Sequence, residues 1–230
     1  MGYLQFDTKV AEQLEGVEKK KYIQQIRIVK TLYVDGPQTT SKLCKRLRIS
    51  TPNMVAIMAE MFERNILEKK GQGKSIGGRK PDLFGLVADS FYILAVEMSI
   101  YKVSIAIFNA ENNQITETEE YSVELNNKKE TLDEILELIN SYIDRSGLDK
   151  SGFLSVGISM PGLVDSVKGI NYTYMNFGDK PVTELMEESI GCPVFVENDE
   201  GVQKLNIRTT LVSICNKISF YVTPKSPEGD

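Results

Sequence analysis

The sequence predicts an α/β protein whose N-terminal part is a small helical module closed by a β-hairpin. Charge divides the chain, because residues 19–80 hold 15 Lys and Arg against 4 Asp and Glu, a balance of +11, while the remainder stands at −16. The apolar pattern also changes, from helical spacing before residue 65 to strand-like runs alternating with helices after Phe91. We therefore expect two domains, over residues 19–88 and 89–230.

The composition excludes several classes of protein. The 230 residues contain no histidine, which excludes Ser-His-Asp and Cys-His catalysis and removes the commonest metal ligand. Cys44, Cys192 and Cys215 lie far apart, as expected of reduced thiols in a cytoplasmic protein rather than of a zinc site. The sequence shows neither a secretory signal nor an apolar run long enough to cross a membrane. We expect a cytoplasmic protein with no membrane association, no catalytic residue, no metal and no cofactor.

The first helix of the basic module is predicted over residues 19–34, because apolar residues recur there on one helical face. Asp35-Gly36-Pro37 is expected to end it, since glycine and proline do not continue a helix. The residues of that face are Tyr22, Ile26, Val29 and Tyr33.

Two further helices are predicted with a three-residue turn between them. The first begins at a cap formed by Thr39 or Thr40, and the second runs from Thr51 to about Arg64. This pair is typical of a helix-turn-helix, in which the first residues of the second helix meet the bases in the major groove; an ordinary helical hairpin is the alternative. The inward face of the second helix is predicted as Val55, Met58, Met61 and Phe62. The expected base-contacting residues are Ser50, Thr51, Asn53, Met54 and Ile57.

A basic, glycine-rich loop, GQGKSIGGRKP over residues 71–81, lies between the predicted strands ILEKK and DLFGLV. Glycine adopts positive φ and lets the backbone approach a surface closely, while arginine is attracted into a narrow minor groove. We expect a hairpin wing whose Lys74, Arg79 and Lys80 contact DNA, although a flexible basic linker is the alternative reading. The helix pair and the hairpin together predict a winged helix-turn-helix domain that binds double-stranded operator DNA.

The acidic body alternates strands and helices. Three strands are predicted over 91–125, followed by a helix over 131–145, a strand over 153–160, a helix over 181–190 and a strand over 193–199. This order is typical of an α/β fold with a mixed sheet, in which ligands bind beyond the carboxyl ends of the strands. Pro161-Gly162 and Asn198-Asp199 are therefore expected at the same edge of the sheet.

Three stretches in order resemble the ROK family of sugar repressors and sugar kinases. They are SIGGRKP, GISMPGLVDSVKGI and PVFVEND, and the resemblance covers roughly residues 20–200. It implies a winged helix-turn-helix followed by an α/β lobe of the actin-like ATPase or ribonuclease H-like kind. The family's repressor branch implies a DNA-binding regulator that represses sugar-utilisation genes. A homodimer or higher homo-oligomer and a sugar or sugar-phosphate effector are implied in the same way.

The resemblance also implies a sugar site. Its residues would be Pro161, Gly162, Asn176, Asn198 and Asp199. In kinases of the family the aspartate that matches Asp199 deprotonates the attacked hydroxyl, a role that a positioned carboxylate can fill in phosphoryl transfer. Without the resemblance, Asn198-Asp199 would be interpreted as a turn that ends a strand.

The chain departs from the kinases of the family. Their Asp-x-Gly-x-Thr phosphate loop is replaced by residues 97–101, EMSIY, which lack the glycine that lets N–H groups surround a phosphate. The family's zinc site and sugar-contacting histidine are also missing. The resemblance stops after Glu200, so we expect an incomplete lobe with an atypical tail over 201–230 from a truncated or frameshifted gene.

A regulator that is not an enzyme is therefore the leading hypothesis. Two alternatives stay open: a ROK-type hexose kinase with an N-terminal DNA-binding extension, and a truncated DNA-binding remnant that does not respond to a ligand.

Overall fold

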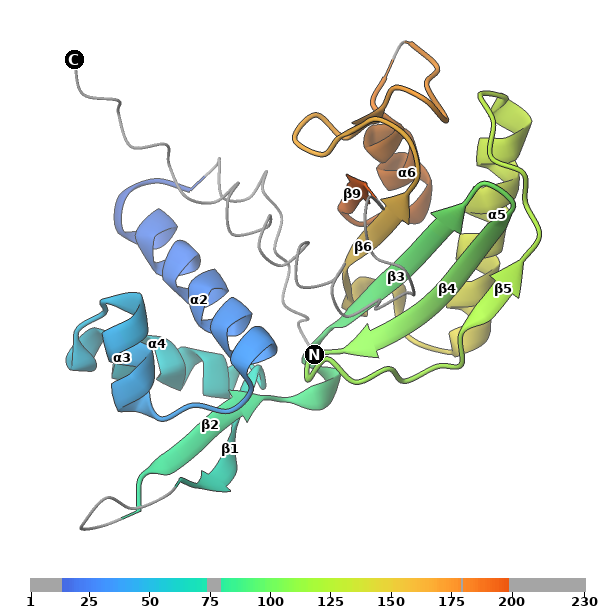
Figure 1. Cartoon of the computed structure of the whole chain (residues 1–230). Helices are drawn as coiled ribbons and strands as arrows, with labels where there is room; N and C mark the ends of the chain where they lie inside the picture. Colours follow the sequence, from blue (N-terminus) through green and yellow to red (C-terminus); the bar gives the residue numbers. More distant parts are fainter. Residues whose placement is uncertain (1–13, 74–79, 179, 199–230) are drawn as a thin grey trace, which may run out of the picture. The chain divides into compact units, whose positions relative to one another are not determined.

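The computed structural model describes residues 14–73, 80–178 and 180–198, and it divides into two compact units (Figure 1). The first unit contains the described residues up to Ser90 together with Ala110–Asn112, and the second contains the other described residues. Within the described ranges, no helix is both long and apolar enough to span a membrane.

Three helices open the first unit, in the order that the sequence predicts. They are α2 (Gly16–Asp35), α3 (Thr40–Leu47) and α4 (Thr51–Glu63). Thr39 caps α3, because its hydroxyl accepts a hydrogen bond from the backbone N–H of Lys42 at 3.3 Å. Arg48 ends α3 in the left-handed conformation, with φ at 54°. The chain then needs only Arg48, Ile49 and Ser50 to enter α4.

The buried face of α4 differs from the predicted face by about one residue. Met54, Ile57, Met58 and Met61 are buried, whereas Val55 is 54% exposed and Phe62 is 37% exposed. Apolar residues occupy most positions of α4, so their spacing alone does not select one face. The face that packs on α2 and α3 decides which of them become core, and the prediction of Val55 and Phe62 as inward residues was wrong.

A two-stranded antiparallel sheet closes the first unit. It is formed by β1 (Leu67–Gln72) and β2 (Asp82–Leu86), with an irregularity in register between Lys69 and Gly71. The predicted hairpin strands are therefore present. The edge-on contact between the rings of Phe62 and Phe84, with centroids 5.6 Å apart, joins α4 to this hairpin. Residues 74–79 of the glycine-rich loop lie outside the described residues.

The second unit contains a five-stranded mixed sheet in the order β5-β4-β3-β6-β9. The pairs β5-β4 and β4-β3 are antiparallel, whereas β3-β6 and β6-β9 are parallel, so the predicted mixed sheet is confirmed. The strands are β3 (Tyr92–Ser99), β4 (Lys102–Asn109), β5 (Glu119–Tyr121), β6 (Phe153–Met160) and β9 (Val194–Asn198).

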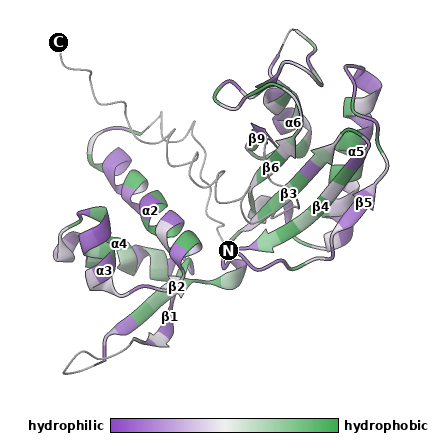
Figure 2. Cartoon of the chain, in the orientation of Figure 1, coloured by the Kyte–Doolittle hydropathy of each residue, from purple (hydrophilic) through white to green (hydrophobic). Residues whose placement is uncertain are grey.

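Every second residue of the central strands points into the core of this unit. On β3, residues 92, 94, 96 and 98 pack with α5 (Lys129–Ser146) and α6 (Val182–Ile190), so both helices cover the same face of the sheet. Figure 2 shows apolar residues concentrated along β3, β4 and β6.

The third of the strands predicted over 91–125, which covers residues 114–125, is shorter in the structure, where Glu119–Tyr121 form β5. Before it, one antiparallel bridge joins Gln114 to Phe108, and side chains supply further contacts. The Ile107 N–H donates to the Thr116 hydroxyl at 2.9 Å, and the Tyr142 hydroxyl donates to the Glu117 carbonyl at 2.7 Å. Sequence alternation does not reveal such side-chain contacts, so the prediction was too long.

Candidate functional site

The start of α4 presents the polar residues that the sequence assigns to base contact. Ser50, Thr51 and Asn53 are exposed in the first unit. Ser50 precedes the helix in an extended conformation, and its side chain makes no capping hydrogen bond. The Asn53 amide donates to Gln24 Oε1 on α2 at 3.0 Å, which orients its side chain on the surface. A hydroxyl and an oriented amide at a helix start are groups able to hydrogen-bond base edges.

Two of the predicted base-contacting residues are corrected by the structure. Met54 is 0% exposed and Ile57 is 2% exposed, so both side chains belong to the core of the first unit and cannot reach a base. Their places on the exposed surface of α4 are taken by Val55, Ala56 and Ala59, which the sequence analysis did not propose. The only signal for these residues is their position one step along the helix from the buried face.

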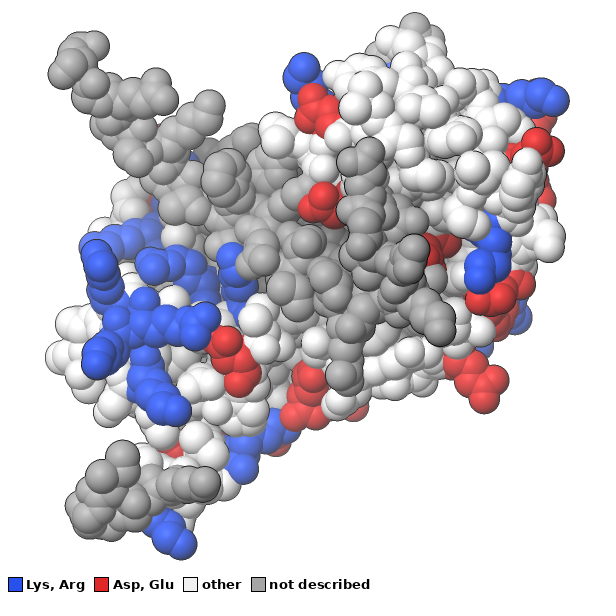
Figure 3. Space-filling view, viewed as in Figure 1, with Lys and Arg blue, Asp and Glu red and all other residues white. Residues whose placement is uncertain are grey.

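The hairpin carries several cations, and two of them form ion pairs within the described residues. Lys69 forms an ion pair with Asp82 at 2.7 Å, and Lys70 pairs with Glu68 on the same strand. Lys80 is exposed at the start of the returning chain, and no ion pair is recorded for it within the described ranges. Lys74 and Arg79 lie outside the described residues. Lys and Arg side chains also gather over α2 and α3 (Figure 3).

The second unit brings the ends of two neighbouring strands together. Met160 on β6 is in register with Asn198 on β9, and the Asn198 amide donates a hydrogen bond to the Gly162 carbonyl. Pro161, Gly162 and Asn198 therefore meet at one edge of the sheet, as the sequence predicts. Asp199 lies outside the described residues.

Asn171, which the sequence analysis did not single out, holds the loop that follows β6. It is fully buried at the end of β8 (Ile170–Asn171), which pairs with β7 (Val164–Asp165). Its amide donates to the Pro161 carbonyl at 2.8 Å, and its carbonyl accepts from the N–H groups of Thr173 and Tyr174 at 2.9 and 3.0 Å. A single asparagine in such a short strand gives no sequence signal that distinguishes a buried hydrogen-bonding role from a surface turn.

Gly162 is required by the close packing of this loop. Its φ is +99°, and a Cβ added there would lie 2.6 Å from the Thr173 Cβ and 3.1 Å from Asn171 Oδ1. The Thr173 hydroxyl in turn accepts a hydrogen bond from the Leu163 N–H at 2.9 Å. The glycine therefore keeps the backbone close to the clamp.

Asp165 closes the turn between β7 and β8. Its carboxylate accepts hydrogen bonds from the backbone N–H groups of Lys168 at 3.0 Å and Val167 at 3.1 Å. The Lys168 hydrogen bond contributes most to holding the pKa of Asp165 below its ordinary value. The Asp165 carboxylate therefore stabilises the turn between β7 and β8 through its hydrogen bonds to the backbone.

Asn176 belongs to a separate part of the same loop network. Its N–H donates to Asn127 Oδ1 at 3.0 Å, and the Asn127 amide donates to the Thr173 carbonyl at 3.1 Å. The Asn176 side chain is exposed and accepts from the Gly178 N–H at 3.3 Å. Within the described residues, Asn176 thus forms hydrogen bonds with Asn127 and Gly178 and none with Asn198.

The stretch that replaces the kinase phosphate loop forms a tight turn. Ile100 and Tyr101, both exposed, are the two residues between β3 and β4, and Ser99 pairs with Lys102 across the turn. Residues 99–102 contain no glycine, and such a turn leaves few N–H groups free to surround a phosphate.

Metal and thiol chemistry gain no support from the described ranges. There, no group of three or more Cys, Asp or Glu side chains is arranged to hold a metal ion. Burial raises the pKa of Cys192 to about 12, with a smaller contribution from Glu187, so this thiol stays protonated at neutral pH and is a poor nucleophile.

Residues 93–206 match the ROK family. The xylose repressor of Bacillus spizizenii is 24% identical over 180 residues, which is 78% of this chain and 47% of that protein. The DNA-binding transcriptional repressor Mlc of Escherichia coli strain K12 is 23% identical over 169 residues, covering 71% of this chain and 41% of that protein. The chain thus spans about half the length of the relatives that it matches.

A solved structure agrees with this match in fold. It is a ROK family transcriptional regulator described as a homolog of the Escherichia coli Mlc protein, with a TM-score of 0.60 and 20% identity. The similarity covers 78% of this chain and 46% of that one. The chain therefore carries a ROK family domain, and its second unit has the α/β fold of that family.

Proposed function

We propose that the protein is a DNA-binding transcriptional regulator that represses sugar-utilisation genes. One observation carries this proposal: a basic unit with two short helices joined by Arg48-Ile49-Ser50 and followed by an antiparallel hairpin precedes a ROK domain. That order of elements supports a winged helix-turn-helix. The names of the relatives, which are repressors, support the same function.

In the proposed complex, α4 lies in the major groove of the operator. Thr51 and Asn53 then hydrogen-bond base edges, Ser50 contacts the adjacent backbone, and Val55 meets thymine methyl groups. Lys80, with Lys74 and Arg79 of the preceding loop, contacts phosphates or the minor groove. Because operators of helix-turn-helix proteins are paired half-sites, a homodimer is the proposed DNA-binding form.

The proposed effector is a sugar or sugar phosphate that binds at the edge formed by the β6 loop and the end of β9. There Asn171 and Asn198 already bond the carbonyls of Pro161 and Gly162, which fixes the loop before a ligand arrives. Asn176 and Asp199 complete the proposed site. Binding would act on DNA affinity only if the ligand favours one of two states of the protein, as any coupling between sites requires.

The same family domain is also compatible with a hexose kinase, but the turn after β3 argues against it. Ile100 and Tyr101 make a two-residue connection without glycine where a kinase requires a loop around the nucleotide phosphates. We therefore propose that the chain is not an enzyme. With ATP and common hexoses, it is expected to form no sugar phosphate in a coupled assay, and measurable turnover would contradict this part of the proposal.

The Asn53→Ala substitution tests the DNA-binding part. If Asn53 reads a base, the variant should lose about 1–3 kcal/mol of affinity for the selected operator and little for random DNA. The measurement is fluorescence anisotropy against an operator selected from random duplexes and against a scrambled duplex. Asn140→Ala, which removes another helical asparagine from α5, is the matched control. Equal losses on both duplexes would contradict base reading by Asn53.

A further inference from the structure

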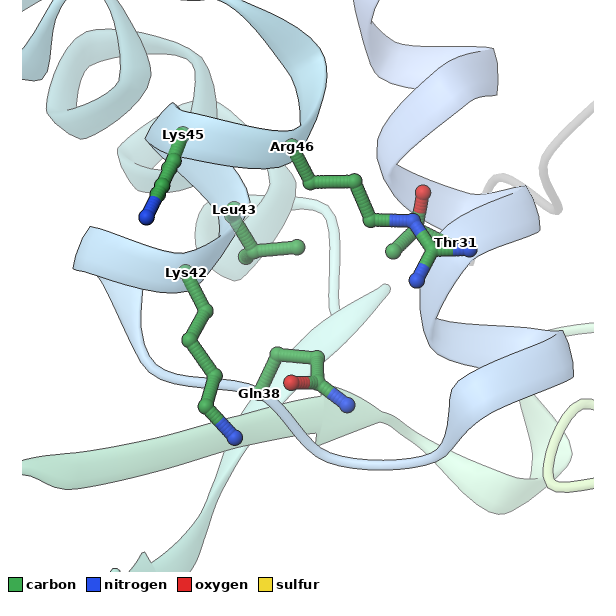
Figure 4. A pocket seen from close by; sticks show the side chains of 6 residues that line it. All are labelled: Thr31, Gln38, Lys42, Leu43, Lys45 and Arg46. Atoms are coloured by element: carbon green, nitrogen blue, oxygen red, sulfur yellow. The ribbon is translucent and has the colours of Figure 1, made fainter.

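A basic pocket opens between α2 and α3 of the first unit, and its lining residues are not among those that the proposed function assigns to DNA or sugar contact. It has a volume of about 540 Å³. Figure 4 shows Lys42 and Lys45 projecting from one side of α3, while Arg46 extends towards Thr31 on α2. The lining residues are Thr31, Gln38, Lys42, Leu43, Lys45 and Arg46.

The charge of this pocket is strongly positive. Arg46 is paired with Asp35, whose Oδ2 lies 2.8 Å from its Nη1. For Lys42 and Lys45, by contrast, the described part of the chain records no carboxylate partner. Three cations therefore face one carboxylate around the pocket, and Asp35 orients the guanidinium of Arg46.

Their spacing gives this cluster a cost in folding. Lys42 stands at i,i+3 from Lys45 and at i,i+4 from Arg46, the spacings at which like charges repel on a helix surface. The helix dipole favours Lys45 and Arg46, which lie in the last turn of α3, so it offsets part of this repulsion. An anionic ligand would relieve the repulsion and convert it into binding free energy.

The remaining lining residues define the kind of anion. Leu43 is fully buried and forms an apolar wall. Thr31 is nearly buried and donates its hydroxyl hydrogen to the Arg27 carbonyl at 2.8 Å, while the Gln38 amide donates to the Asp35 carbonyl at 3.2 Å. The free donors are therefore mainly ammonium and guanidinium groups, which suit an anion with several acceptor oxygens.

We propose that this pocket binds a phosphate group, supplied either by the backbone of bound DNA or by a small phosphorylated solute. Lys42 and Lys45 contact the phosphate oxygens directly, and Arg46 contributes from its place beside Asp35. The DNA source rests on the proposed function, in which it would add backbone contacts beside those of α4 and the hairpin. The small-solute source does not require DNA binding, because it would make the pocket a ligand site of its own.

The test compares the full chain with the double variant Lys42→Ala/Lys45→Ala. The matched control is Lys20→Ala/Lys129→Ala, which removes the same charge at two other exposed positions. Both variants are expected to fold, since alanine favours helix at exposed helical sites, and circular dichroism checks this. The first probe is inorganic phosphate, followed by amide chemical shifts in NMR; the second is a DNA duplex, followed by anisotropy at several salt concentrations.

Two results support the proposal and identify the source. Saturable shifts of the Lys42, Lys45 and Arg46 amides with phosphate, lost in the pocket variant alone, assign the site to a small phosphorylated solute. A fall in the salt slope of DNA affinity by about two units in the pocket variant, but not in the control, assigns it to the DNA backbone.

Other results overturn the proposal. If the pocket variant and the control behave alike with both probes, the pocket is no phosphate site and only the overall charge matters. If the wild-type chain binds no DNA at any salt concentration, the proposed function fails. The phosphate titration then tests the pocket independently of DNA. Amide chemical shifts that do not saturate with inorganic phosphate would show that the pocket is not a phosphate site.

Discussion

Asn171 shows at the scale of single residues how a buried amide fixes a candidate binding loop. Three backbone groups, from Pro161, Thr173 and Tyr174, depend on its side chain. Gly162 can approach the clamp only because it has no Cβ. The loop is therefore shaped by contacts within the second unit, before any ligand is present.

The Asn171→Ala variant is expected to be destabilised by about 1–3 kcal/mol, because it removes three hydrogen bonds between a buried side chain and partly buried backbone groups. The free energy of unfolding, measured by urea denaturation, checks this. Asn126→Ala is not a suitable control, since Asn126 accepts bonds at the start of α5. Asn113→Ala, at an exposed turn, is the better one. A loss no larger than that of this control would show that the clamp contributes nothing to the fold.

At the scale of elements, α4 has two apolar surfaces with different roles. Met54, Ile57, Met58 and Met61 pack inward, while Val55 stays exposed beside Thr51 and Asn53 on the surface that we propose to face DNA. The residues that pack in the core and those that we propose to face DNA are thus direct neighbours along α4, as Met54 and Val55 show.

This separation predicts that two neighbouring substitutions have effects of very different size. Met54→Ala should lower the free energy of unfolding by about 2–5 kcal/mol, because it removes a fully buried side chain. Val55→Ala should change the free energy by no more than about 0.5 kcal/mol, as is usual for an exposed site. Thermal or urea unfolding of both variants gives the comparison. The reverse order would mean that the face predicted from the sequence was the inward one after all.

The elements that the sequence predicts well are those with a strong local signal. The turn from α3 into α4, a threonine cap at the start of α3 and the strands that end at Met160 and Asn198 all follow from residue type and spacing. The inward face of α4 does not, because apolar residues surround the helix and only packing selects among them. The role of Asn171 could not be predicted either, because its hydrogen bonds join residues that only the folded loop brings together.

At the scale of the whole molecule, a basic unit and a ROK domain are joined in one chain. The two units differ in charge and in fold, and the candidate contacts for DNA and sugar lie in different units. A regulator requires both, because DNA affinity must depend on the ligand. The chain spans about half the length of the repressors that it resembles, so the sugar response is a proposal for this chain to be tested directly.

The most direct test is a titration of the full chain against DNA from upstream of its own gene, with a scrambled duplex of equal length beside it. The account predicts tighter binding to the upstream DNA, with an affinity that falls steeply as salt rises. Repetition with a panel of sugars then shows whether one of them releases the DNA. Equal affinity for both duplexes, confirmed by a failure to select any preferred sequence from random DNA, would contradict the central claim that this protein is a sequence-specific DNA-binding regulator.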